Sequence, residues 1–161
     1  MRKGDFVKQS RTPLTWALRS GFFICVLALA ALQGCAINRE SASTSPDVDL
    51  SQLKKFYVVK FAPDQRGINM VIANELTRLG FEASTGLDLD APKDVDAIVT
   101  YEDKWQWDMT MYMIGLTITM REPGSNRLLA IGHSYHTSLT RKSPPEMVAE
   151  VLTNIFKAKN K

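Results

Sequence analysis

Residues 96–122 read DAIVTYEDKWQWDMTMYMIGLTITMRE, a run of 27 residues rich in β-branched, aromatic and other apolar side chains. Strands in globular proteins usually have about 5–6 residues, so a run of this length must bend or reverse. We place a tight reversal near Trp107-Asp108, although neither Gly nor Pro marks the position. The run therefore predicts two strands joined by a tight turn.

The alternation of apolar side chains changes phase within this run. One face holds a group that we name the Trp–Met set: Trp105, Trp107, Met109, Met111 and Met113. The other phase holds Ile114, Leu116, Ile118 and Met120. One extra residue at Ile114-Gly115, forming a β-bulge, would let both groups face the core.

The residues before the run predict a strand–helix–strand unit. Phe56–Phe61 is a continuous apolar segment typical of a central strand, and Pro63–Gly67 ends it. One face of the following helix is formed by Ile68, Val71, Ile72, Leu76 and Leu79. Gly80 stands where a glycine ends a helix, and Phe81–Ser84 predicts a second strand. The two strands are expected to be parallel, with a right-handed crossover.

The residues after the run predict one more strand and a second helix. Glu122–Asn126 is a strong turn signal, and Arg127–Thr140 follows it as a strand. One side of this strand is expected to carry Leu129, Ile131, Tyr135 and Leu139. Ser143, Pro144 and Glu146 predict a helix start with a capping box. The apolar stripe of this helix consists of Met147, Val148, Val151, Leu152, Ile155 and Phe156.

Together these elements predict an α+β fold in the order β-α-β-β-β-α, in which the run 96–122 is counted once although it holds two strands. The expected architecture is a two-layer sandwich, in which two helices cover one face of a mixed sheet of about five strands. We assign this single domain to residues 51–161. Residues 36–50 are rich in Ser, Thr and Asp without a sustained period, which predicts a flexible tether with a reach of roughly 20 Å.

The N-terminus has the pattern of a secretory signal. A basic segment precedes Gly21–Leu32, an apolar run of 12 residues that falls short of the ~20 needed to span a bilayer. Leu32-Gln33-Gly34-Cys35 then resembles the lipobox of bacterial lipoproteins. This resemblance implies that residues 1–34 are removed by cleavage between Gly34 and Cys35, and that Cys35 is acylated.

The lipobox also bears on localisation and on cysteine chemistry. Ala36 stands where lipoproteins retained in the inner membrane usually have Asp, so the resemblance implies sorting to the outer membrane, with the domain facing the periplasm. Cys25 would be lost with the signal peptide. The mature chain would then have no free thiol, disulfide or Cys-ligated metal.

The net charge of +3 is unevenly distributed along the chain. Residues 1–34 hold five basic side chains and one acidic side chain, whereas the remainder holds 15 basic and 16 acidic ones. The mature protein would therefore be nearly neutral. This balance argues against nucleic acid as a partner.

Metal ligands are expected to be absent, and so are cofactors. His133 and His136 lie three apart on a predicted strand, so their side chains point to opposite faces. We expect His133 in the core or at its rim, in the row of Ile131 and Tyr135, and His136 in solvent. A solvated acidic loop, without the spacing of a Ca²⁺ loop, is formed by Asp88, Asp90, Asp94 and Asp96.

Catalytic residues are not expected either. The chain has no phosphate-binding glycine loop and no Gly-x-Ser-x-Gly motif. Ser134 and His136 lie two apart on one strand face, and a hydrolase would need both at a cleft with an acid nearby. A strand register that buries Ser134 would remove this alternative.

The Trp–Met set admits two interpretations. The first is that this face packs under the helices as core. The second is that it forms an adaptable apolar binding face, because Met side chains are flexible and polarisable and Trp is frequent at interface hot spots. Such a face would hold an acyl chain or a helix of a partner.

A lipobox followed by a small α+β domain resembles the small envelope lipoproteins of Gram-negative bacteria. The run Tyr101-Glu102-Asp103-Lys104-Trp105-Gln106-Trp107-Asp108 is similar to uncharacterised members of that group. Lipoproteins of this kind serve as accessory subunits of lipid-transport and envelope-assembly machines. The resemblance therefore implies a non-enzymatic binding component that contacts another envelope protein. The alternative is a module that binds lipid or another apolar ligand in an internal cavity lined by the Trp–Met set.

Overall fold

The computed structural model describes residues 38–158, so the signal peptide, the cleavage site at Gly34 and the acylation of Cys35 lie outside the described residues. Residues Ala36–Lys161 form one compact unit. Among the described residues, no helix has the length and apolarity required to cross a bilayer.

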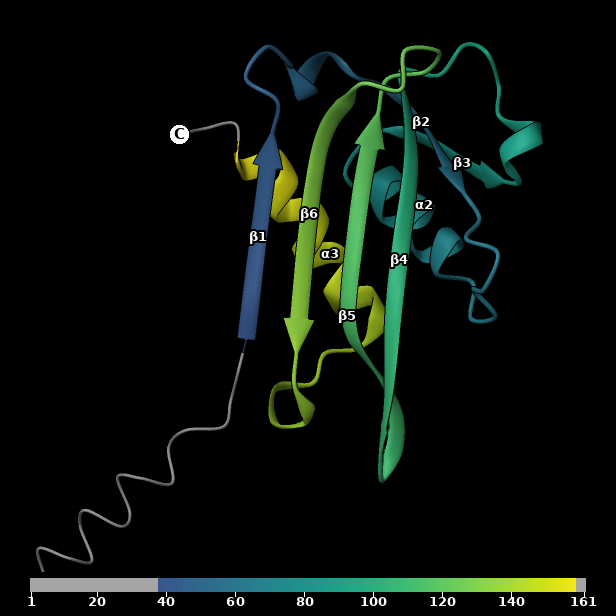
Figure 1. Ribbon diagram of the computed structural model, residues 1–161. Coiled ribbons are helices and arrows are strands. Elements are labelled where there is room, and N and C mark those ends of the chain that lie inside the picture. The colour runs from purple at the N-terminus through teal and green to yellow at the C-terminus, as the bar shows by residue number, and fades with distance from the viewer. Residues whose placement is uncertain (1–37, 159–161) are drawn as a thin grey trace, which may run out of the picture. The chain divides into compact units, whose positions relative to one another are not determined.

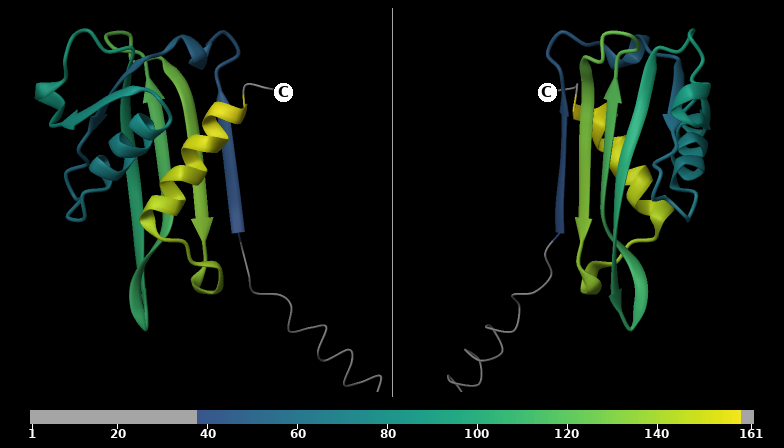
Figure 2. Two further views of the ribbon diagram at one scale, coloured as in Figure 1. Left: turned by 180° about the vertical axis from the view of Figure 1, so that it is seen from behind. Right: turned by 45° about the vertical axis from the view of Figure 1, so that its right-hand side comes forward.

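The structure is an α+β sandwich with both long helices on one face of an open mixed sheet (Figures 1 and 2). The strands are β1 (Asn38–Thr44), β2 (Lys55–Val59), β3 (Glu82–Gly86), β4 (Ala97–Asp108), β5 (Thr110–Arg121) and β6 (Leu128–His136). The helices are α2 (Ile68–Arg78) and α3 (Pro144–Lys157), with the short 3-10 turns η1 (Leu50–Gln52), η2 (Asp88–Asp90) and η3 (Ser138–Thr140). The sheet order is β1-β6-β5-β4-β2-β3. The predicted class and layer arrangement are confirmed, with six strands instead of five.

The sixth strand is β1, which lies in the segment predicted to be a tether. It pairs antiparallel with β6 over its whole length, from Asn38 opposite His136 to Thr44 opposite Ala130. The tether prediction is wrong for these residues, and so is the domain start at residue 51. Backbone hydrogen bonds to the edge of β6 hold β1 in place, whereas its side chains are mostly exposed. A strand held in this way leaves little hydrophobic pattern in the sequence.

The strand–helix–strand prediction is confirmed by β2, α2 and β3, whose strands are parallel. Gly80 has φ +95 and ends α2 in a Schellman motif. Its N–H donates to the Thr77 carbonyl at 3.0 Å, and the N–H of Phe81 donates to the Leu76 carbonyl at 3.1 Å. These bonds satisfy carbonyls that would otherwise be left free at the helix end.

Asp64 anchors the start of α2 and was not singled out from the sequence. Its carboxylate is buried and accepts backbone N–H bonds from Arg66, Gly67 and Ile68 at 2.7–2.9 Å. The hydroxyl of Tyr101 on β4 donates to the same carboxylate at 2.6 Å. Burial by itself would raise the pKa of Asp64, but these bonds outweigh it and lower the pKa. The helix is therefore tied to the centre of the sheet.

The β4–β5 hairpin confirms both the reversal and the bulge. The chain turns at Met109, which has φ +57, one residue beyond Trp107-Asp108. Lys104 pairs with Gly115 and Trp105 pairs with Met113, so Ile114 is the extra residue on β5. The bulge keeps Met113 on the helix-covered side, together with the alternate residues that follow it on β5: Leu116, Ile118 and Met120.

From Ala130 onward, strand β6 faces the opposite way to the prediction, and the strand ends earlier. Leu129, which precedes this stretch, is buried in the core. Its helix-facing residues are Ala130, Gly132, Ser134 and His136, all of them buried. His133 and Tyr135 are exposed on the other face, and η3 replaces the last predicted strand residues. The prediction failed because it placed the larger apolar residues inside. Helix α3 lies so close to β6 at position 132 that a residue without a side chain is needed there.

The closest approach occurs at Gly132. A Cβ atom added there would lie 2.8 Å from Val151 Cγ1 and 2.8 Å from Ile155 Cγ1, inside normal contact distance. At Gly115 on β5 an added Cβ would meet no atom closer than 3.7 Å. The two glycines can therefore be compared directly, because an added methyl group would clash at Gly132 and would fit at Gly115.

We expect Gly132→Ala to lower the free energy of unfolding by about 1–3 kcal/mol, because α3 must shift to admit the methyl group. Gly115→Ala is expected to change it by less than about 0.5 kcal/mol. Urea unfolding of both variants measures the difference. Equal effects of the two substitutions would contradict close packing at Gly132.

Candidate functional site

The structure does not give the five residues of the Trp–Met set a common environment. Met113 is in the core, and Trp105 is half-buried against it. Trp107, Met109 and Met111 are 69%, 88% and 48% exposed. The core interpretation therefore holds for Met113. Trp107, Met109 and Met111 lie at the surface, and their role as a binding face stays a prediction. The sequence could not separate them, because the alternation continues unchanged from the covered part of the hairpin into the projecting part.

The exposed residues lie at the end of the β4–β5 hairpin, residues 107–111, which we name the hairpin tip. Arg141, which follows η3, holds this tip in place. Its guanidinium donates to the Asp108 carbonyl at 2.9 Å, to the Asp108 carboxylate at 3.1 Å and to the Thr110 hydroxyl at 2.8 Å. It also lies 4.3 Å from the ring centroid of Tyr112. The tip and η3 therefore form one connected surface.

Leu139 on η3 adds to this surface, with 74% of its area exposed. Sequence reasoning placed Leu139 on the apolar side of a strand and gave no role to Arg141. The signal available was an Arg three residues before the helix, but its partners are 31–33 residues away in sequence. Only the folded chain brings them together.

A buried polar network lies between β6 and α3, centred on Glu150. The hydroxyl of Ser134 donates to its carboxylate, and the ammonium of Lys142 contacts the other carboxylate oxygen. His136 Nε2 lies 2.7 Å from Glu150 Oε2 and must donate there, because an ionised carboxylate only accepts. His136 is thus 1% exposed, which contradicts its predicted position in solvent.

The network keeps Glu150 ionised. Burial by itself would raise the pKa of Glu150, but the bonds from Lys142, Ser134 and His136 outweigh it and lower the pKa to about 2. Breaking such a network leaves buried groups without partners, which is costly. Its first effect is therefore to fix α3 on β6.

The network does not have the geometry that the hydrolase alternative requires. Ser134 is 2% exposed and its hydroxyl bonds to Glu150 instead of the imidazole of His136. A nucleophile needs a base within reach and an open path for substrate. The register found here buries Ser134, which is the condition that removes this alternative.

Potential cation ligands also meet at this network. One ligand atom each from Glu40, His136 and Glu150 lie within 4.8 Å of one another. The carboxylate of Glu150 already accepts from an ammonium, a hydroxyl and an imidazole, and Asn154 donates to Glu40 at 3.0 Å. These bonds account for the cluster as hydrogen bonding between α3 and the sheet.

The acidic loop before β4 has structural partners. Asp96 accepts the backbone N–H groups of Lys54 and Lys55 at 2.7 and 2.9 Å. Asp94 bonds to the Lys55 ammonium at 2.8 Å. Within residues 38–158, the acidic residues of this loop do not form a cluster of three potential cation ligands.

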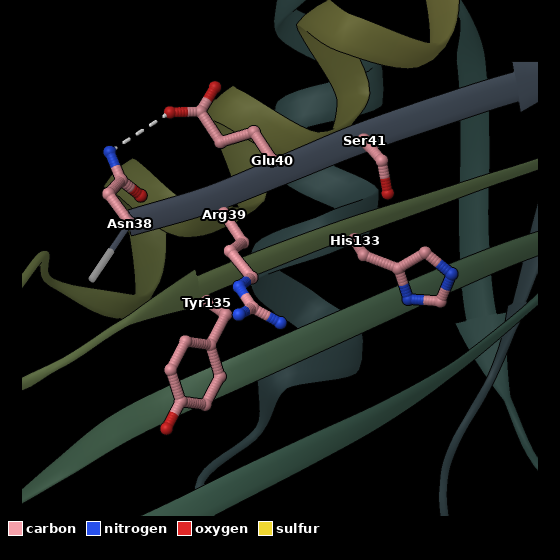
Figure 3. A pocket seen from close by; sticks show the side chains of 6 residues that line it. All are labelled: Asn38, Arg39, Glu40, Ser41, His133 and Tyr135. Atoms are coloured by element: carbon pink, nitrogen blue, oxygen red, sulfur yellow. Dashed lines mark hydrogen bonds between the residues drawn. The ribbon is translucent and has the colours of Figure 1, made fainter.

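The sheet face opposite the helices carries a groove at the β1–β6 edge, with a volume of about 830 Å³. Its lining residues are Asn38, Arg39, Glu40, Ser41, His133 and Tyr135. The strand register places Arg39 opposite Tyr135 and Ser41 opposite His133. Figure 3 shows these four side chains on one side of β1 and Glu40 on the other. His133 Nδ1 lies 2.9 Å from the Thr117 hydroxyl, so this imidazole is held at the surface.

No protein-family model and no curated protein matches the chain. Its structure is similar to two structures of the PelC dodecamer from Paraburkholderia phytofirmans, one of them a point variant. The TM-scores are 0.57 and 0.55, at 14% identity. The matches cover 74% and 73% of this chain and 98% and 96% of the PelC chains. At this identity the likeness shows the fold alone.

We expect Glu150→Gln to lower the free energy of unfolding at pH 7 by about 2 kcal/mol. The ordinary pKa of 4.5 in the unfolded chain lies above the folded value. The contribution of the carboxylate is therefore complete above about pH 5 and is lost as the pH falls toward 2. Urea unfolding at several pH values should show the two proteins converging in acid. The exposed control Glu102→Gln should stay within about 0.5 kcal/mol of the wild type at pH 7, and a pH-independent deficit of Glu150→Gln would refute the assignment.

Proposed function

We propose that this chain is a non-enzymatic binding component of the Gram-negative cell envelope. It is anchored to the outer membrane through acylated Cys35 and faces the periplasm. It works through protein–protein contacts, without metal or cofactor. The lipobox supports the anchor, and the groove at the β1–β6 edge supports the contact with protein.

The groove is the observation that carries the proposal. It lies on the sheet face opposite α2 and α3 (Figure 2). Tyr and Arg are enriched in protein interfaces, and the strand register places Arg39 beside Tyr135 here. Tyr135 is 38% exposed, so a partner would bury a substantial area of its ring. Hydroxyl and imidazole groups around it, from Ser41 and His133, supply hydrogen bonds at the rim.

The partner is another envelope protein, and a second copy of this chain is the first candidate. PelC structures with this fold are dodecamers. Assemblies of identical chains use self-complementary or head-to-tail contacts between sheet faces, edges and helices. In this chain the sheet has one open face and one exposed edge, formed by β1. It therefore offers a sheet face and a sheet edge for such contacts.

A module that binds lipid or an apolar ligand is the alternative. It requires an internal cavity lined by the Trp–Met set. Trp107, Met109 and Met111 point into solvent at the hairpin tip, and Met113 packs in the core. This placement supports contact with an external surface better than an enclosed ligand.

We expect Tyr135→Glu to weaken the protein contact by about tenfold or more, because a buried interface Tyr often contributes above 1 kcal/mol and the new charge would have to be desolvated. The lipidated protein in mild detergent would be measured by native mass spectrometry, after crosslinking in the envelope. Leu89→Glu, at a side chain 97% exposed on η2, should leave the complex intact. A wild-type protein that crosslinks to neither itself nor another protein would overturn the proposal.

A further inference from the structure

One end of the domain gathers several exposed apolar side chains at the place where the chain enters β1. They are Trp107, Met109 and Met111 of the hairpin tip and Leu139 of η3. Figure 1 shows the β4–β5 turn, the segment after β6 and the start of β1 at the same end of the sheet. We name this end the anchor end.

The strand register sets how far the tip projects past the start of β1. Arg39 is level with Tyr135, Gly115 and Lys104 across four strands, so Asn38 is level with Trp105. Met109 lies four residues beyond Trp105, a projection of roughly 13 Å at the rise of a strand. Cys35 precedes Asn38 by three residues, which span at most about 10 Å. Measured from the level of Asn38, an acyl anchor on Cys35 and the hairpin tip can therefore extend by similar distances toward the bilayer.

The pairing of β1 with β6 limits how far the domain can lie from the acyl anchor and how it can be oriented. Had residues 36–50 been a free tether, the domain would have had a reach of roughly 20 Å and any orientation toward the membrane. With β1 paired to β6 from Asn38 onward, only two residues separate Cys35 from the sheet. The domain must then stay close to the bilayer with its anchor end toward it.

The chemistry of the tip suits a lipid interface. Trp is enriched at the level of the lipid headgroups, and Met and Leu add apolar area. Asp108 is the single charged residue between Trp105 and Met113, and its carboxylate is paired with Arg141. Placing the tip among headgroups therefore does not require burial of an unpaired charge.

Met109 at the apex is poorly explained by folding alone. A residue with φ +57 is most easily Gly or Asn, and an L side chain such as Met is strained there. Met109 is also 88% exposed, so it gains almost no burial inside the domain. Its apolar side chain is useful only to a contact outside the domain.

We propose that the hairpin tip and η3 insert into the headgroup region of the bilayer that holds the acylated Cys35, and so fix the orientation of the domain. This inference rests on the lipid anchor of the proposed function. The proposed occupant of the anchor end is lipid, which leaves the groove at the β1–β6 edge facing the periplasm for protein.

The test uses the lipidated protein in vesicles of phosphatidylethanolamine and phosphatidylglycerol, with lipids brominated along the acyl chains as a fluorescence quencher. The mature chain has two tryptophans, Trp105 and Trp107. We expect bromolipids to quench the wild type and Trp105→Phe strongly. Trp107→Phe should lose most of this quenching, because its remaining indole is half-buried and held by Asp103.

Met109→Asn separates docking from folding. Asn tolerates the left-handed backbone, so the hairpin should fold at least as stably as the wild type. Quenching of Trp107 should nevertheless fall by about threefold, because the polar apex no longer enters the bilayer. Leu89→Asn, at an equally exposed apolar residue outside the anchor end, should leave quenching unchanged.

Flotation of the vesicles and the mass of the N-terminal peptide distinguish failure of the insertion from failure of the lipid anchor. A protein that floats and carries acyl groups, but whose Trp107 is not quenched, would overturn the insertion and leave the anchor standing. A Trp107 that becomes shielded only when a protein partner is added would overturn it in favour of a protein contact. A chain without acyl groups that does not float would overturn both.

Discussion

Helix α3 can lie directly on β6 because position 132 carries no side chain. A Cβ atom added at Gly132 would lie only 2.8 Å from Val151 Cγ1 and 2.8 Å from Ile155 Cγ1. Strand side chains alternate strictly, so the choice of Gly132 as an inward residue also decides the direction of its neighbours. The outward direction of His133 and Tyr135, and with it the groove at the sheet edge, follows from this one contact.

Because Gly132 faces inward, the polar residues two and four positions after it, Ser134 and His136, face the interior as well. Ser134 and His136 must then find partners under α3, and Glu150 on that helix accepts from both. Lys142 supplies a positive charge to the same carboxylate, so a buried acid stays ionised. A pair of residues that suggested a nucleophile thus forms part of the attachment between helix and sheet. Burial and hydrogen-bond direction, which no spacing rule contains, separate the two roles.

The open sheet face and the anchor end are two distinct surfaces, and their chemistry differs. The open face carries Arg39, Tyr135 and hydroxyl groups, whereas the anchor end carries Trp, Met and Leu side chains with one neutralised ion pair. Strand β1 connects them, because its outward residues line the groove and its first residue lies three positions after Cys35. An edge strand with almost no hydrophobic signal therefore links the two surfaces.

Local patterns were sufficient for the strand–helix–strand unit, the hairpin with its bulge at Ile114 and the capped helix α3, because each depends on neighbours a few residues apart. The sequence by itself therefore determined the α+β class and the order of the elements from β2 to α3. Only the tertiary structure decided that residues 38–44 form a strand, which face of β6 is buried, and which members of the Trp–Met set reach solvent. These outcomes depend on an unpaired strand edge, on a close helix contact and on how far a hairpin projects. All three arise between segments distant in the chain, so no local pattern records them.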